Sequence, residues 1–258
     1  MHPTISRLPS VLFYEGRLED GPGMEQKTTQ PWHQSQILGV YKFYDIRGTE
    51  SRADKGHSQY NQEEVQCALA LYARLRNEFP AVNFDYRIGI IAMYRGQLTI
   101  LKNAFKARYG QTIWSKIDFN TVDGFQGQEK DIIILSCVRA GTSLNTIGFL
   151  ADPRRVNVSI TRSRSSLYIL GHAATLERSD ELWKGIVADA RTRNLLISVR
   201  FSLLIFNECS SQFRQLQQLS EHKRHLNSLL PSLLVPTLGR LLELSRQRKT
   251  TDTRRQRN

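Results

Sequence analysis

The sequence predicts an α/β protein in which helices cover both faces of a parallel β-sheet. One observation behind this prediction is that short apolar runs alternate with helix-like segments between residues 61 and 190. Another is that these runs are continuous, as in strands buried on both faces, and do not alternate with polar residues. The 258 residues, 40% of them hydrophobic, suffice for one sizeable domain with an appendage or for two small domains.

Helices are predicted over residues 61–79, 95–110, 152–166 and 179–190. In the first, second and fourth of these segments the apolar residues recur at helical spacing. The first begins with Asn61 and Glu64, which are three residues apart and resemble a capping box. The third begins with Asp152 and Pro153, residues typical of the N-cap and the first position of a helix. Buried strands are predicted at the short apolar runs, which are residues 87–94, 117–119, 132–138 and 167–170.

A polar loop with two glycines, TVDGFQGQE, stands between two of the predicted strands. In parallel sheets, the loops at the carboxyl ends of strands gather in a crevice where ligands bind. The polar candidates in this loop are Thr121, Asp123, Gln126 and Glu129. Gly124 and Gly127 leave room for a ligand or for another backbone segment. Because Asp, Gly and Gln also form ordinary turns, chemistry alone leaves a binding loop and a plain turn as alternatives.

Arginines gather in the segment that follows Pro153. Arg155 and Arg162 are seven residues apart, close to two helical turns, and are predicted to project from nearly the same side of one helix. Arg162 and Arg164 would lie near the end of that helix. There they either complement the helix dipole and its free carbonyls or bind an anion. A fixed arginine beside a transferring phosphoryl group stabilises the charge that develops in the transition state.

Several classes of protein are disfavoured by composition. The N-terminus lacks the basic start and apolar stretch of a signal peptide, and no apolar run approaches the roughly 18 residues of a membrane span. We therefore expect an intracellular protein with no membrane partner. Cys67, Cys137 and Cys209 are scattered and odd in number, which predicts reduced thiols. No cysteine or carboxylate cluster joins His222 and His225, so no metal site is predicted.

The net charge of +12 is concentrated near the C-terminus. From Arg191 onward, 13 Lys and Arg face four acidic residues, a net +9, which leaves 23 against 20, a net +3, for residues 1–190. We predict a domain over residues 1–194, made of an N-terminal segment and loop (1–60) and a core (61–194). A basic extension over residues 195–258, largely disordered or weakly helical, would follow. Its arginines are either solvated or contact phosphates non-specifically.

Four segments together resemble superfamily 1 helicases of the nonsense-mediated-decay and senataxin kind. TVDGFQGQEKDIIILSCVRA resembles motif V of that family, and GFLADPRRVNVSITRSRSSLYILG resembles motif VI. MHPTISRLPSVLFYEGRLEDG and IGIIAMYRGQ are similar to the segments that precede these motifs, and all four occur in the family's order. The resemblance covers residues 1 to about 190. It implies a second RecA-like motor domain, with the parallel sheet of P-loop NTPases but without the P-loop itself.

The resemblance also implies roles in nucleotide binding. Arg162 would be the catalytic arginine finger on the γ-phosphate of ATP. Glu129 would hold the ribose, and Gln126 and Gly127 would shape the nucleotide-binding loop.

Other residues would serve nucleic acid by the same resemblance. Thr121 and Arg95 would contact single-stranded RNA or DNA. Asp123 and Arg155 would couple the nucleotide to the nucleic acid. Arg95 lies in a segment similar to PYxxQ, in which Met93 stands where the family usually has proline.

Two departures from the family bear on activity. The chain contains neither GxxxxGK[ST] nor a DE-type magnesium motif, and it begins at the methionine of the family's tyrosine-arginine-methionine-histidine-proline segment. We therefore expect ATP with Mg²⁺ to bind only together with a first RecA-like domain, supplied in cis or in trans. The isolated chain would not hydrolyse ATP, because a composite site needs both halves.

Two classes of function remain open from the sequence. In the first, the chain is the C-terminal half of an ATP-dependent RNA or DNA helicase of the nucleus or cytoplasm. In the second, it is a non-catalytic module or remnant that contributes only contacts to nucleic acid or protein.

Overall fold

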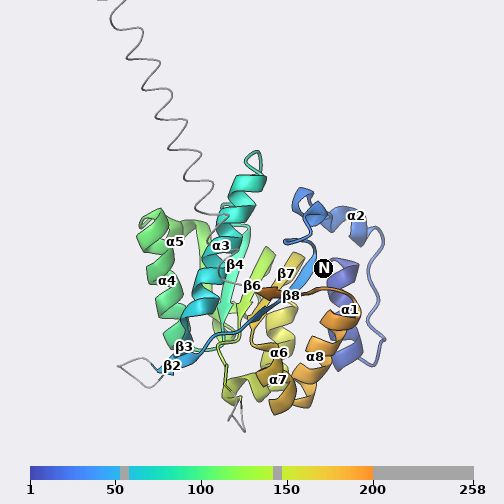
Figure 1. The fold of residues 1–258 in the computed structure, drawn as a ribbon. Helices are drawn as coiled ribbons and strands as arrows, with labels where there is room; N and C mark the ends of the chain where they lie inside the picture. Colours follow the sequence, from blue (N-terminus) through green and yellow to red (C-terminus); the bar gives the residue numbers. More distant parts are fainter. Residues whose placement is uncertain (53–57, 142–146, 200–258) are drawn as a thin grey trace, which may run out of the picture. The chain divides into compact units, whose positions relative to one another are not determined.

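The computed structural model describes residues 1–52, 58–141 and 147–199, and it confirms the predicted parallel sheet. Six strands lie in the order β5-β4-β6-β7-β1-β8, and each pair of neighbours is parallel (Figure 1). Their bounds are β1 Tyr41–Ile46, β4 Ile88–Ala92, β5 Ile117–Thr121, β6 Lys130–Ser136, β7 Ser163–Gly171 and β8 Leu196–Val199. A separate antiparallel pair consists of β2 (Glu50–Arg52) and β3 (Gln59–Asn61).

Helices cover both faces of the six-stranded sheet, as predicted (Figure 1). On one face lie α3 (Gln62–Glu78), α4 (Arg95–Tyr109) and α5 (Ile113–Lys116). On the other face lie α1 (Pro3–Phe13), α6 (Pro153–Ile160), α7 (Ala173–Ser179) and α8 (Glu181–Thr192). The remaining helical segments are α2 (Met24–Thr28), η1 (Pro31–Gln34), η2 (Asp123–Phe125) and η3 (Gly148–Ala151).

Strand β6 shows how the sheet divides the core. Ile132 and Ile134 pack in the cluster beneath α3 and α4, whereas Ile133 and Leu135 pack in the cluster beneath α6 and α8. All four side chains are fully buried. Because successive strand residues point to opposite faces, a continuous apolar run is what a strand covered on both sides requires.

The predicted helix over residues 152–166 is shorter than expected. Asp152 caps its start as predicted, but α6 ends at Ile160, and β7 begins at Ser163. The backbone N–H of Lys130 donates to the Arg162 carbonyl, so the chain has already entered the sheet there. Arg162 therefore lies in the turn after α6 and Arg164 in β7, and the prediction that they share a helix with Arg155 is wrong.

Two strands of the six-stranded sheet, β1 and β8, lie where the sequence predicts none, and so do both strands of the β2–β3 pair. Strand β1 falls within the segment expected to be only an N-terminal segment and loop, yet it pairs with both β7 and β8. Strand β8 follows the predicted domain boundary at residue 194 and extends the sheet to Val199. The rest of the basic extension, residues 200–258, lies outside the described residues.

The loop from β5 to β6 crosses the sheet, because β4 lies between these two strands. Phe125 in this loop is fully buried, and it packs over Gly89 of β4. A Cβ atom on Gly89 would lie 2.5 Å from Cζ of Phe125 and 2.8 Å from Cδ1 of Ile133. The absence of a side chain at Gly89 thus leaves space for the loop, which runs from the carboxyl end of β5 to the amino end of β6.

We expect Gly89→Ala to lower the free energy of unfolding by about 1–3 kcal/mol, because the added methyl overpacks a closed core and displaces Phe125. Urea unfolding at neutral pH measures this change. Gly21→Ala is the matched control, since its added Cβ would meet only Met24 Cγ at 3.8 Å. Equal stability of the two variants would contradict the assigned contact.

Candidate functional site

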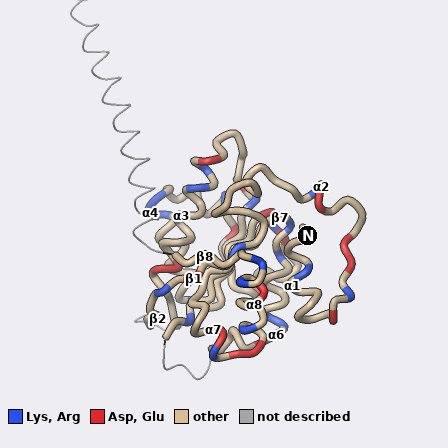
Figure 2. Tube along the Cα trace, turned by 45° about the vertical axis from the view of Figure 1, so that its right-hand side comes forward, with Lys and Arg blue, Asp and Glu red and all other residues tan. Residues whose placement is uncertain are grey.

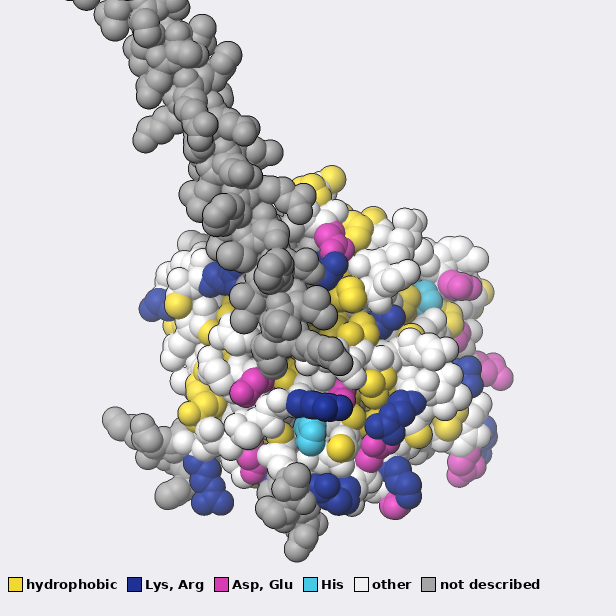
Figure 3. Space-filling model, in the orientation of Figure 1, with side chains coloured by type: hydrophobic (Ala, Val, Ile, Leu, Met, Phe, Trp, Pro, Cys, Tyr) yellow, Lys and Arg dark blue, Asp and Glu magenta, His cyan; other side chains and the backbone are white. Residues whose placement is uncertain are grey.

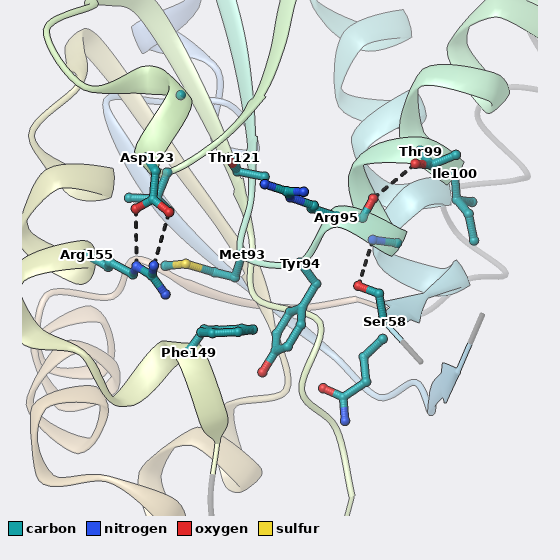
Figure 4. Close-up of a pocket in the computed structure, with 14 residues that line it drawn as sticks. Ser58, Met93, Tyr94, Arg95, Thr99, Ile100, Thr121, Asp123, Phe149 and Arg155 are labelled. Carbon is teal, nitrogen blue, oxygen red and sulfur yellow. Dashed lines mark hydrogen bonds and ion pairs between the residues drawn. The ribbon is translucent and has the colours of Figure 1, made fainter. Parts of the chain in front are cut away.

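An open pocket of about 1140 Å³ lies at the carboxyl ends of β4 and β5 (Figure 4). Four of the residues predicted from the sequence line it, namely Arg95, Thr121, Asp123 and Arg155. Arg95 begins α4, Thr121 ends β5, Asp123 begins η2 and Arg155 lies in α6. The fold thus brings together side chains that the sequence separates by up to 60 residues.

One side of this pocket suits an anion. The α4 helix begins there with Arg95, whose side chain is exposed and makes no ion pair within the part of the chain that the structure describes. The N-terminus of a helix of this length carries partial positive charge and N–H groups that have no partner within the helix. One of them, the Gly96 N–H, donates to Ser58 Oγ at 2.9 Å. Thr121 adds a half-buried hydroxyl at the neighbouring strand end.

The two residues predicted to couple the sites contact each other directly. Nε of Arg155 lies 3.2 Å from Oδ1 of Asp123, and a terminal nitrogen lies 3.1 Å from Oδ2 (Figure 4). This two-point ion pair joins the loop after β5 to α6. Although 68% of the Asp123 side chain is exposed, the bidentate geometry fixes the direction of the Arg155 guanidinium.

Two aromatic side chains complete the pocket, and sequence reasoning did not select either as a site residue. Tyr94 is nearly buried and donates from its hydroxyl to the Ile147 carbonyl at 3.0 Å. Phe149 in η3 is 55% exposed, and its ring centroid lies 5.6 Å from that of Tyr94. No local pattern distinguishes Phe149 from a core residue, because only the tertiary contacts of its neighbours turn it outward.

The predicted nucleotide-binding residues lie outside this pocket. Glu129 and Arg162 immediately precede β6 and β7, at the amino ends of the strands, which we call the amino edge of the sheet. The Lys130 N–H donates to the Arg162 carbonyl there at 3.0 Å. Glu129 Oε2 accepts a hydrogen bond from Arg164 Nε at 3.1 Å. The pocket lies at the carboxyl ends of the parallel strands, which we call the carboxyl edge, and these residues lie at the opposite, amino ends. The predicted site residues therefore form two groups, which the loop over β4 connects.

At the amino edge, Arg162 is held by the end of α6. Its Nε donates to the Val158 carbonyl at 3.1 Å, and one terminal nitrogen donates to Thr161 Oγ1 at 3.0 Å. This is the geometry of the first alternative, in which an arginine satisfies free carbonyls at a helix end. A guanidinium has five N–H donors, so the same orientation leaves donors for an anion.

The glycines of the loop have two different explanations. A Cβ on Gly124 would collide with Oδ1 of Asn120, so this glycine accommodates a neighbouring side chain. Gly127 has φ +80° and open space around it, so its backbone conformation requires glycine. Gln126 beside it is exposed.

Charge on the described part of the chain is mixed. Figure 2 shows basic and acidic residues interspersed along the trace, and Figure 3 shows them side by side on one face. Many are ion-paired, as Arg164 is with Glu129. An electrostatic attraction for polyanions in this domain must therefore come from local geometry, as at Arg95, because residues 1–190 carry a net charge of only +3, as counted above.

Comparison with known proteins decides the family. Residues 1–174 match the family model described as an AAA domain. The chain belongs to this family. Over 198 residues it is 51% identical to helicase sen1 of Schizosaccharomyces pombe, an alignment that covers 77% of this chain and 12% of the relative.

Two further relatives support the same assignment. The probable helicase MAGATAMA 3 of Arabidopsis thaliana is 44% identical over 201 residues, covering 77% of this chain and 24% of the relative. Regulator of nonsense transcripts 1 of Caenorhabditis elegans is 34% identical over 200 residues, covering 76% of this chain and 18% of the relative. The predicted membership, a RecA-like motor domain of a superfamily 1 helicase, is confirmed. The chain spans less than a quarter of the length of these relatives.

The described ranges of this helicase domain contain neither a helix that could span a membrane nor a cluster of metal-binding side chains. None of the helices there combines the length and apolarity needed to cross a bilayer. Nor do the residues of these ranges include a group of three His, Cys, Asp or Glu side chains that could hold a metal ion. Cys67 and Cys137 are buried free thiols.

A buried polar network lies beneath the pocket of the helicase domain. Asn61 Oδ1 accepts from Glu64 N–H at 3.1 Å, which is half of the predicted capping box. The other half is absent, because Asn61 N–H donates to Gln97 Oε1 instead. The Glu64 carboxylate turns inward, where it accepts from Ser136 Oγ at 2.5 Å and from Val138 N–H at 2.9 Å.

Glu64 is fully buried, and this shifts its titration. Burial raises the pKa of Glu64 from 4.5 to about 8, although hydrogen bonds from Ser136 and from the backbone of Val138 and Cys137 oppose that rise. The network ties the start of α3 to the end of β6 and, through Gln97, to the start of α4. It therefore fixes the position of the first turn of α4, which carries Arg95.

Glu64 should make stability depend on pH. Between pH 4.5 and about 8 the folded protein keeps the Glu64 proton that the unfolded chain has lost, so the free energy of unfolding falls as pH rises. The slope from this one group is about 1.4 kcal/mol per pH unit. Glu64→Gln removes that slope while preserving a neutral side chain of the same shape.

Urea unfolding of wild type and Glu64→Gln at pH 5, 6, 7 and 8 measures this effect. The variant should gain stability relative to wild type as pH rises. Glu181→Gln, at a site where 88% of the side chain is exposed, should show no such trend. A stability difference that is the same at pH 5 and pH 8 would rule out the buried proton.

Proposed function

We propose that this helicase domain binds single-stranded nucleic acid in the pocket at the carboxyl edge and contributes to a composite ATP site at the amino edge. The main support for this proposal is the course of the loop over β4. It begins at Thr121 in the pocket and ends at Glu129 beside Arg162. A short segment that touches both ligands can convert a change at one into a movement at the other.

The pocket supports contacts to phosphates. The start of α4, the Arg95 guanidinium and the Thr121 hydroxyl all lie on its lining. Helix N-termini and arginines are the usual ligands of backbone phosphates, and such contacts are independent of base sequence. RNA and DNA share this backbone, so these residues do not select between them.

The amino edge supports contacts to a nucleotide. Glu129 and Arg162 lie side by side there, and Arg162 is oriented by α6. Loops that cradle β- and γ-phosphates use backbone N–H groups and a lysine of the GxxxxGK[ST] motif, which these 258 residues do not contain. We infer that another RecA-like domain, in cis or in trans, supplies that loop and the Mg²⁺ ligands, while Arg162 supplies the finger.

Coupling would pass through the ion pair between Asp123 and Arg155. It joins the loop that reaches both sites to α6, the helix whose end holds Arg162. A shift of α6 on nucleotide binding would therefore act on Asp123 and on the pocket. The same geometry without ATP turnover would be that of a binding module, which is the alternative function.

We expect Arg95→Ala to weaken binding of the 258-residue chain to a single-stranded oligonucleotide and to lower the salt dependence of log K by about 0.7, the contribution of one phosphate contact. Fluorescence anisotropy from 50 to 200 mM salt measures both effects. Lys106→Ala, an exposed cation in the last turn of the same helix, is the control. If both variants bind with the wild-type salt slope, Arg95 is not a phosphate ligand.

We also expect Arg162→Ala to reduce ATP turnover by about 10³-fold or more, the usual loss on removing an arginine finger, with little change in nucleic-acid affinity. The assay is steady-state ATP hydrolysis by a protein in which this domain is paired with its phosphate-loop partner domain. Arg154→Ala, an exposed arginine of α6, should retain turnover. Unchanged turnover in Arg162→Ala would leave the helix-capping bonds as its only role and would refute the finger assignment.

A further inference from the structure

We propose that Phe149 is a base-stacking residue, so that the pocket holds the bases of a single-stranded nucleic acid as well as its phosphates. This inference rests on the proposed nucleic-acid function of the pocket and adds the part of the ligand that a phosphate site leaves unbound. Aromatic side chains beside a cationic groove are the general solution for strands bound without sequence preference.

Phe149 presents an exposed aromatic side chain to the pocket. Within the described parts of the chain, six large apolar side chains are exposed, namely Val11, Tyr14, Leu18, Tyr86, Trp114 and Phe149. Of these, Phe149 alone lines the pocket. Phe149 is 55% exposed, and covering its ring with a base would remove apolar surface from water.

The backbone around Phe149 is held by hydrogen bonds from two buried aromatic side chains. Ile147, two residues before it, and Leu150, directly after it, are buried. Both are anchored, because Tyr94 Oη donates to the Ile147 carbonyl at 3.0 Å and Trp183 Nε1 donates to the Leu150 carbonyl at 2.9 Å. Gly148 has φ +59°, and a Cβ there would lie 2.9 Å from Tyr94 Oη. The ring is therefore presented by a fixed backbone, and little conformational entropy is lost when a base covers it.

The Phe149 ring lies beside the guanidinium of Arg155. The Arg155 guanidinium lies 5.1 Å from the Phe149 ring centroid, and Asp123 fixes that guanidinium with two contacts. A planar cation and an aromatic ring are the two kinds of surface on which bases stack. Figure 4 shows this pair on the η3 and α6 side of the pocket, with Arg95 on the α4 side. Bases and phosphates of one strand would thus meet different walls.

The test compares two oligonucleotides of equal length and charge, a single-stranded oligothymidylate and a strand in which the central nucleotides are abasic. Phe149→Ala in the 258-residue chain should weaken binding to the first roughly 10-fold. It should change binding to the abasic strand less than about twofold, since there is no base to stack. The salt slope should stay at the wild-type value, because no phosphate contact is removed.

Two variants serve as controls in the same anisotropy assay. Phe149→Trp keeps a stacking surface and should bind the oligothymidylate at least as tightly as wild type. Tyr86→Ala removes the aromatic ring of a residue that is 67% exposed but lies outside the pocket, and it should bind as wild type does. Thermal unfolding of each variant shows whether it is folded.

The outcomes separate this inference from the proposed function. If Phe149→Ala weakens binding equally on both strands, or on neither, the stacking role is wrong. When that happens while Arg95→Ala still weakens binding, the phosphate site stands without Phe149. If the wild-type chain binds neither strand, the proposed nucleic-acid function falls, and the stacking role falls with it.

Discussion

The packing of Phe125 over Gly89 is the contact on which the arrangement of the two candidate sites depends. Strands β5 and β6 flank β4, so the chain between them must cross the sheet while the rest of the core stays closed. Phe125 is fully buried in that crossing, and a Cβ on Gly89 would meet it at 2.5 Å. Dense packing makes such a crossing an all-or-none arrangement, because a well-packed core does not deform continuously.

Polar contacts rather than apolar burial organise the carboxyl edge. Glu64, Ser136 and Gln97 form a hydrogen-bonded chain between α3, β6 and α4, and each is fully buried. A buried polar group without a partner destabilises the folded state by more than a hydrogen-bonded one stabilises it. The three hydrogen-bonded side chains are therefore compatible with only one arrangement of α3, β6 and α4. The specificity of that arrangement is what places the start of α4, and with it Arg95, beside Thr121.

Most of the core could be predicted because its signals are local. The continuous apolar run Ile132 to Leu135 indicates a strand buried on both faces, and Asp152 and Asp180 cap the helices that follow them. Strand β1 was missed because Lys42 and Asp45 interrupt its apolar run, and its place in the sheet comes from pairing with β7 and β8, which lie more than 100 residues away. The family could be predicted because its motifs are contiguous segments.

The sequence by itself determined the type of sheet, the helices on its two faces, the family and the candidate residues for two ligands. Only the tertiary structure decided that these candidates separate, with Arg95, Thr121, Asp123 and Arg155 in the pocket and Glu129 and Arg162 at the opposite edge. It also decided that α6 ends before Arg162 and that Phe149 lines the pocket. The physical reason is that contacts between distant residues decide the order of the strands and the end of the sheet at which each loop lies. The local pattern of apolar residues indicates only which faces of a helix or strand are buried.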